Sequence, residues 1–136
     1  MGEIRWLDDR ESRAWRGFRR MGVLLHARVA RELASETGLS YTDYDVLSHL
    51  SEVPDERLRL NELGARLQWT KSRLSHHATR MERRGLVRRD GCESDGRGAW
   101  LVLTDAGRRA IEAAVPSHVA SVRQHLIDRL SPEQLA

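Results

Sequence analysis

The chain has 136 residues, a length that suits one domain or a small subunit of an oligomer. Hydrophobic residues make up 40% and charged residues 32%, with three prolines and ten glycines, which excludes a disordered or collagen-like polymer. No apolar run approaches the roughly 18 residues of a membrane span, and the N-terminal stretch lacks the pattern of a signal peptide. The single cysteine, Cys92, cannot form an intrachain disulfide, so we expect a cytoplasmic protein.

Positive charge is concentrated in one part of the chain. Of the 23 basic residues, all but Lys71 are arginines. Residues 57–97 contain 11 basic and 5 acidic residues, a net charge of +6, whereas the remainder contains 12 basic and 15 acidic residues, a net charge of −3. Such polarity is typical of a face that binds phosphate groups.

The first predicted element is a long helix over residues 9–36. Apolar residues recur at steps of three and four along it, and Thr37-Gly38 ends it. Thr42 and Asp45 then form a start signal for a second helix, which runs to about residue 52. Pro54-Asp55 breaks the chain after this helix.

Two short helices follow. The third, over residues 61–67, is separated by a tight turn from the fourth, over residues 71–84. Thr70 is the expected N-cap of the fourth helix, and Gly85 is expected to terminate it. The inner stripe of the fourth helix consists of Leu74, Ala78 and Met81. Two short helices of which the second is rich in basic residues predict a helix-turn-helix.

The period then changes to that of strands. Residues 86–89 and 99–104 are rich in Val, Leu and Trp, and the glycine-rich stretch 90–98 between them predicts a β-hairpin with a long tip. A hairpin that directly follows a recognition helix is called a wing. Trp100, on its second strand, is expected in the core of the lobe.

The last part of the chain is again helical. Thr104-Asp105 starts a helix whose apolar residues recur at near-heptad steps from Ile111 to Leu126, and Pro116 predicts either a kink in it or a break into two helices. The stretch 131–134, Ser-Pro-Glu-Gln, is a capping box, so we expect a further helix and a sequence that continues beyond Ala136.

Three motifs together resemble the MarR family of transcriptional regulators. They are the run SRLSHHATRMERRGLVRR at residues 72–89, Asp95-x-Arg97 in the wing, and LTDAG at residues 103–107. Met81 stands where the family usually has leucine. The resemblance implies a homodimer, interlocked through the terminal helices, with two winged helix-turn-helix lobes. It also implies a DNA-binding regulator, usually a repressor, that releases DNA when a small effector, an oxidant or a metal binds.

We therefore predict a mainly α protein with a small β-hairpin wing, of the α+β class. Residues 1–36 are expected to form an N-terminal dimerisation helix, residues 37–104 the winged helix-turn-helix lobe, and residues 105–136 the truncated C-terminal dimerisation helices. The expected partners are a second copy of the chain, a near-palindromic double-stranded operator and a small-molecule effector.

The predicted DNA site follows from the position of the fourth helix. Its N-terminal side chains can reach base edges in the major groove. The expected base contacts are Ser72, Arg73, Ser75 and His76, with Arg73 reading guanine. The expected phosphate contacts are Thr70, Lys71 and Arg80.

In the wing, Arg97 is predicted to enter the minor groove. Asp95 is expected, by the resemblance, to pair with a nearby arginine. The family often has arginine at the position of His76, and Arg88 and Arg89 either touch phosphate or flank the strand.

Alternatives remain open for the effector. Trp6, Trp15 and His26 are candidates for an effector pocket, with dimer core as the other interpretation for the tryptophans. His118 and His125 could join His26 or His49 in a metal site, although we predict none. A thiol at Cys92 could sense oxidants.

Other classes of function fit the sequence less well. Adjacent His76 and His77 diverge by about 100° on a helix and cannot easily share an ion. No motif of a phosphate loop, a serine hydrolase or a metalloprotease is present, so we expect neither an enzyme nor a cofactor. A winged helix that binds protein in place of DNA is the alternative from another class.

Overall fold

The structure is a computed structural model that describes residues 2–91 and 98–136. The predicted wing tip, including Cys92, Asp95 and Arg97, lies outside the described residues. Within the described ranges, no helix is both long and apolar enough to cross a membrane.

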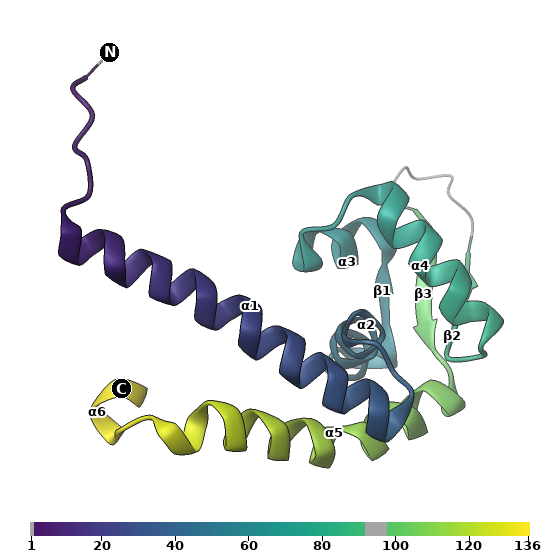
Figure 1. The fold of residues 1–136 in the computed structure, drawn as a ribbon. Helices are drawn as coiled ribbons and strands as arrows, with labels where there is room; N and C mark the ends of the chain where they lie inside the picture. Colours follow the sequence, from purple (N-terminus) through teal and green to yellow (C-terminus); the bar gives the residue numbers. More distant parts are fainter. Residues whose placement is uncertain (1, 92–97) are drawn as a thin grey trace.

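Two long helices extend from one small lobe (Figure 1). Helix α1, Asp9–Thr37, and helix α5, Asp105–His125, form the arms of the molecule; they pack together over the C-terminal part of α1 and diverge away from the lobe. The lobe holds three helices, α2 (Tyr41–Ser51), α3 (Leu60–Leu67) and α4 (Lys71–Arg83). Short elements complete the described chain: η1 (Pro54–Glu56), η2 (Ile127–Arg129) and α6 (Pro132–Leu135).

The lobe also contains a three-stranded antiparallel sheet with the order β1-β3-β2. Its strands are β1 (Arg57–Arg59), β2 (Val87–Asp90) and β3 (Trp100–Leu103). The predicted class, mainly α with a small wing, is therefore confirmed. Strand β1 was not predicted, because three residues, two of them arginines, are too few to display an alternating apolar pattern.

Trp100 occupies the face of the sheet opposite to the expected one. Leu101 and Leu103 point into the core, so Trp100 and Val102 point to the outer face. Arg57 and Arg59 flank the half-buried indole, with their guanidinium carbons 4.3 and 4.4 Å from its ring centroid. The prediction of a core tryptophan was wrong because a four-residue strand shows its composition but not which face is inward.

Side-chain caps set most helix boundaries. Thr70 caps α4 and Thr104 caps α5, as predicted, and Ser131 and Gln134 form the predicted capping box of α6. The cap of α2 differs from the prediction: Ser40 and Asp43 form its capping box, in place of Thr42 and Asp45. The two possible caps lie two residues apart in the sequence, and only the backbone geometry distinguishes them.

Helix α5 runs without a break from Asp105 to His125, with Pro116 inside it. The predicted alternative of two separate helices is therefore wrong. A proline removes one backbone hydrogen bond, and the packing of α5 along α1 compensates for this loss over a helix of 21 residues.

The core lies where the C-terminal part of α1, the start of α5 and the lobe meet. Its largest fully buried side chains include Leu33, Leu47, Leu63, Leu74 and Met81. The predicted inner stripe of α4 is buried, since Leu74, Ala78 and Met81 are each at most 2% exposed. Helix α4 therefore has one fixed orientation relative to the lobe.

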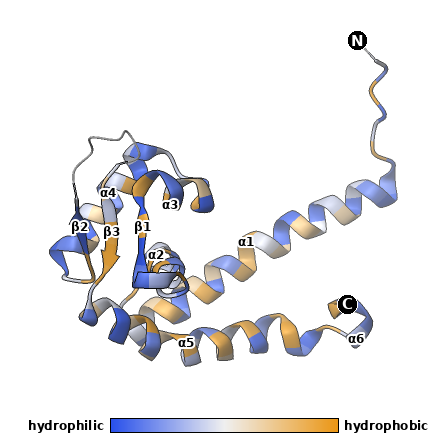
Figure 2. Cartoon of the chain, turned by 180° about the vertical axis from the view of Figure 1, so that it is seen from behind, coloured by the Kyte–Doolittle hydropathy of each residue, from blue (hydrophilic) through white to orange (hydrophobic). Residues whose placement is uncertain are grey.

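The arms beyond the lobe keep apolar side chains in solvent. Figure 2 shows hydrophobic residues recurring along α1 and α5 away from the lobe. The large exposed apolar side chains on these two helices are Trp15, Phe18, Met21, Val23, Leu24, Val115 and Val119.

Gly107 of α5 packs closely against Leu86, the residue before β2, and Leu103 of β3. A Cβ atom there would lie 2.1 Å from the carbonyl oxygen of Leu86 and 2.8 Å from Leu103 Cδ1. We therefore expect Gly107→Ala to lower the free energy of unfolding by about 3 kcal/mol, measured by urea denaturation at fixed protein concentration. Gly2→Ala is the control, because Gly2 precedes α1 and a Cβ there meets nothing within 4 Å. Equal stability of the two variants would contradict the close packing.

Candidate nucleic-acid interface

Helix α4 separates its side chains cleanly into two faces. Leu74, His77, Ala78 and Met81 are buried against the lobe. The opposite face is exposed and contains the predicted contact residues of this helix: Lys71, Ser72, Arg73, Ser75, His76 and Arg80. Residues 70–85 contain five basic side chains and only one acidic side chain, Glu82, so the exposed face is strongly cationic.

The N-terminus of α4 is held by its own cap and by the preceding turn. Thr70 Oγ1 accepts a hydrogen bond from the backbone N–H of Arg73 at 3.1 Å. The Arg73 guanidinium lies over the indole of Trp69, 4.2 Å from the ring centroid, in a cation–π contact. Trp69 itself packs against the core and meets His77 edge-to-face at 5.5 Å. The side chain predicted to read guanine therefore rests on a supported aromatic surface.

Arg89 connects the wing to the recognition helix. Its guanidinium donates to the Ser75 carbonyl at 2.8 Å, to Thr79 Oγ1 at 3.0 Å and to a Glu82 carboxylate oxygen at 3.2 Å. Its backbone N–H also donates to Glu82, at 3.0 Å. Of the two interpretations of Arg89, the structure favours a strand residue that fixes α4, whereas Arg88 is exposed.

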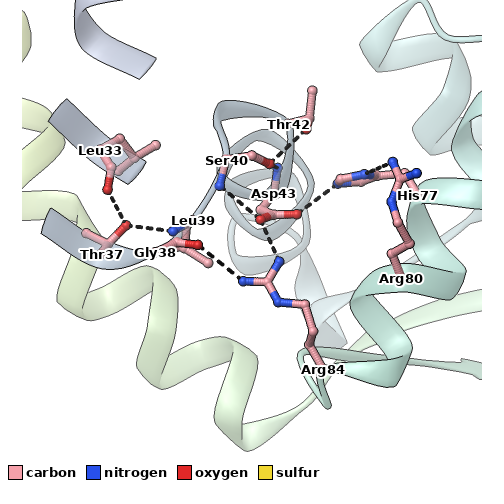
Figure 3. A network of polar contacts seen from close by, with 10 residues as sticks. All are labelled: Leu33, Thr37, Gly38, Leu39, Ser40, Thr42, Asp43, His77, Arg80 and Arg84. Atoms are coloured by element: carbon pink, nitrogen blue, oxygen red, sulfur yellow. Dashed lines mark hydrogen bonds and ion pairs between the residues drawn. The ribbon is translucent and has the colours of Figure 1, made fainter. Parts of the chain in front are cut away.

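A buried carboxylate connects α4 to α2 on the other side (Figure 3). Asp43 Oδ2 accepts hydrogen bonds from Arg84 Nη1 at 2.7 Å and from the backbone N–H of Ser40 at 2.9 Å. Asp43 Oδ1 lies 3.0 Å from His77 Nε2. The side chains of Asp43 and His77 are only 5% and 8% exposed. Arg84 also donates to the carbonyl of Gly38, at the end of α1.

The partners of Asp43 keep it ionised despite its burial. Burial raises the pKa of this carboxyl group, and the interactions with His77, Arg84 and Ser40 outweigh that effect, so the pKa lies well below its ordinary value. Sequence reasoning missed this network. The spacing of Ser40 and Asp43, a capping box, was the signal that could have located it.

The two adjacent histidines of α4 have different environments. His76 is exposed, as expected for a DNA contact, whereas His77 is buried beneath the helix. The Nδ1 atom of His77 lies 3.2 Å from Arg80 Nη2. A guanidinium has only donors, so Nδ1 must accept, and the proton of the neutral ring lies on Nε2, facing Asp43. This pairing with Asp43 is close but poorly aligned, since Nε2 has no well-directed acceptor among the described residues.

The effector candidates are not brought together within one chain. Trp6 precedes α1 and Trp15 lies in its first half, 79% and 52% exposed, at the end of α1 remote from the lobe (Figure 1). His26 is exposed but stacks edge-on against Tyr41 at 4.8 Å. It thus borders a cluster in which His118 stacks on Tyr44 at 4.3 Å and lies 3.3 Å from the Tyr41 hydroxyl.

The remaining histidines have local roles. Burial lowers the pKa of His118, which favours its neutral ring. His125 Nε2 lies 2.8 Å from a Glu32 carboxylate oxygen, and this contact ties α5 to α1. His49 Nδ1 lies 2.8 Å from the Asp45 carbonyl of its own helix. Over residues 2–91 and 98–136, no group of three or more His, Cys, Asp or Glu side chains is arranged to hold a metal ion.

Helix α3, the turn at Gln68, helix α4 and the β2–β3 hairpin together define a winged helix-turn-helix protein. A sequence model described as MarR family matches residues 37–98. The transcriptional regulator HosA of Escherichia coli is 31% identical over 120 residues, which cover 88% of this chain and 86% of that protein. By the extent of this likeness, the chain belongs to the MarR family and is a transcriptional regulator.

Two solved structures from Streptomyces coelicolor agree with this assignment. AbsC, a MarR family transcriptional regulator, is 45% identical with a TM-score of 0.89, over 97% of this chain and 88% of AbsC. Sco3205, a MarR family transcriptional regulator solved in complex with DNA, is 41% identical with a TM-score of 0.90, over 97% of this chain and 83% of that chain.

Asp43 should make the fold sensitive to acid. Because its pKa is depressed in the folded state, the stabilisation is present above the ordinary pKa near 3.9 and is lost as the pH falls toward the folded value. At pH 7, Asp43→Asn should lower the free energy of unfolding by about 2–3 kcal/mol, and the difference from the wild type should shrink below about pH 4.

The control is Asp128→Asn, which removes an exposed ion pair with Arg123 and should cost less than about 1 kcal/mol. Urea denaturation from pH 3 to pH 7 measures both variants. A loss for Asp43→Asn that does not vary with pH would refute the ionised state of Asp43.

Proposed function

We propose that the chain is a homodimeric repressor that binds a near-palindromic double-stranded operator and releases it when a small-molecule effector binds. The observation that supports this proposal is the cationic exposed face of α4. The opposite face of the helix is buried, and hydrogen bonds from Arg84 to Asp43 and from Arg89 to Ser75 hold the helix in place. We expect this activity in the cytoplasm, where a bacterial regulator meets its DNA.

The proposed docking places α4 in the major groove. Ser72, Arg73, Ser75 and His76 are the proposed base contacts, with Arg73 leaving Trp69 to read guanine. Thr70, Lys71 and Arg80 are the proposed phosphate contacts, and Asp95 and Arg97 are proposed to serve the wing. Lys71, at the start of α4, adds its positive charge to the positive end of the helix dipole. Both charges favour the binding of a phosphate group there. Sco3205, which was solved in complex with DNA, supports this use of the fold.

A protein partner fits the exposed face less well. The core of a protein–protein interface is depleted of charged residues, whereas the exposed face of α4 is polar and basic. The duplex is therefore the partner that we propose.

The arms are proposed to form the dimer. A monomer that exposes Trp15 and Phe18, 52% and 63% exposed, would leave a large apolar stripe in water. A second copy of the chain could cover this stripe and that of α5 together. Two recognition helices would then reach half-sites about 34 Å apart, one turn of DNA.

The effector site is proposed near His26, where the arms join the lobe. Tyr41, Tyr44 and His118 provide aromatic surface at the junction of α1, α2 and α5. Occupation of this junction would change the angle between arm and lobe, and with it the spacing of the recognition helices. Trp6 and Trp15 would join such a site only from the partner chain.

Arg73 tests the recognition helix. Arg73→Ala should weaken binding to the DNA directly upstream of the chain's own gene by about 2–6 kcal/mol, or at least about 30-fold in Kd, because each subunit of the dimer loses a bidentate contact with guanine worth about 1–3 kcal/mol. Fluorescence anisotropy at constant salt gives the Kd. Arg123→Ala, which removes the same charge from the far end of α5, should bind within twofold of the wild type. If the two variants bind equally well, Arg73 does not read the operator.

Phe18 tests the dimer. Phe18→Glu places a charge in the proposed apolar seam and should raise the dimer dissociation constant at least about 30-fold, because a buried aromatic anchor is worth about 2 kcal/mol or more. Analytical ultracentrifugation follows the change. Arg16→Glu, about 160° away on the same helix, is the control and should leave the dimer intact. A wild-type chain that sediments as a monomer at every concentration would refute the dimer.

A further inference from the structure

We infer that His77, a buried residue with no path to DNA of its own, positions Arg80 for its contact with phosphate. The inference rests on the proposed function, because it takes Arg80 as a phosphate contact. It adds a second layer to the interface: an imidazole beneath the recognition helix that orients a guanidinium at its edge.

The two nitrogens of His77 have separate tasks. Nδ1 accepts a hydrogen bond from Arg80 Nη2 at 3.2 Å, and Nε2 points toward Asp43 Oδ1 at 3.0 Å. Figure 3 shows the ring between these two partners, one from α4 and one from α2. Because Nδ1 accepts from Arg80, the proton of the neutral ring lies on Nε2, the nitrogen that faces the Asp43 carboxylate. The ring therefore lies between Asp43 of α2 and Arg80 of α4.

The ring is well supported, and the arginine is not. His77 is 6% exposed and its ring meets Trp69 edge-to-face, so it is fixed on two sides. Arg80 is exposed. An exposed arginine loses up to about 2 kcal/mol of rotamer freedom when it is immobilised on a ligand. A contact that already orients the guanidinium in the free protein removes part of that cost from DNA binding.

Simple packing is the competing explanation for a buried His77, and leucine or methionine would serve it as well. A buried imidazole with one nitrogen on a carboxylate and the other on an exposed arginine does more than fill space. Burying a polar ring is unfavourable unless its nitrogens are used. In this chain, the use of Nδ1 is a contact with a side chain of the proposed interface.

Two substitutions separate the tasks of the nitrogens. Asn carries an oxygen close to the position of Nδ1, so His77→Asn can still accept from Arg80 but loses Asp43. Gln carries a nitrogen close to the position of Nε2, so His77→Gln can still reach Asp43 but loses the acceptor for Arg80. The first variant should lose folding stability and keep its affinity for DNA, whereas the second should fold normally and bind more weakly.

The experiment is a double-mutant cycle on the DNA upstream of the chain's own gene, with Kd measured against salt concentration and stability measured by urea denaturation. Arg80→Ala should weaken binding and make the slope of log K against log salt about one unit shallower per subunit. His77→Gln should weaken binding about 3- to 10-fold in the presence of Arg80 and by less than about twofold when residue 80 is Ala. His77→Asn should bind within about twofold of the wild type.

The outcomes distinguish this inference from the proposed function. Equal affinity of His77→Gln and the wild type, while Arg80→Ala binds weakly, would overturn the positioning role and leave the DNA site intact. The same loss for His77→Gln with and without Arg80 would also overturn it, because His77 would then act by another route. If Arg80→Ala binds as tightly as the wild type, Arg80 is no phosphate contact, and both assignments fail.

Discussion

One ionised carboxylate, buried between α2 and α4, fixes the orientation of the recognition helix. Asp43 closes the capping box of α2 through Ser40, accepts a hydrogen bond from Arg84, the C-cap residue of α4, and lies 3.0 Å from His77 Nε2. An unpaired buried charge would be costly, so the two helices must stay together for the carboxylate to keep its partners. The contact of Arg84 with Gly38 extends this constraint to the end of α1, where the arm meets the lobe.

The wing holds the same helix from the other side. Arg89 donates from β2 to Ser75, Thr79 and Glu82, along the exposed flank of α4. Apolar packing through Leu74 and Met81 would permit small rotations of the helix, whereas directed hydrogen bonds on both flanks restrict them. The proposed reading of base edges would need this restriction, since it depends on where each side chain of α4 points.

Much of the fold could be predicted from the sequence, and the exceptions have physical reasons. The stripe of Leu74, Ala78 and Met81 has the period of a helix, so the buried face of α4 was evident before the structure. Strand β1 was missed because it is an edge strand of three residues that is stabilised by pairing with β3, a contact distant in sequence. Pro116 did not break α5, because packing along α1 is stronger than the local preference of one residue.

Only the exposed residues of the candidate site could be predicted from the sequence, and not the polar pairs that hold α4 in place. Exposed residues such as Arg73 follow from charge and helix position alone. The second layer depends on distant pairs, such as Asp43 with Arg84 and Ser75 with Arg89, whose spacing carries no local signal. His77 illustrates the difference: it lies beside Ala78 of the predicted inner stripe, but the contacts of its two nitrogens required the structure.

The central claim is that the outer face of α4 docks on the phosphates of a DNA duplex. The most direct test is the affinity of the wild-type protein for the DNA upstream of its own gene, measured over a range of salt concentrations. If a dimer neutralises phosphates with Lys71 and Arg80 of each subunit, log K should fall linearly with log salt, with a slope of about −3 to −4. An affinity that does not change with salt would contradict the claim and would favour a protein partner.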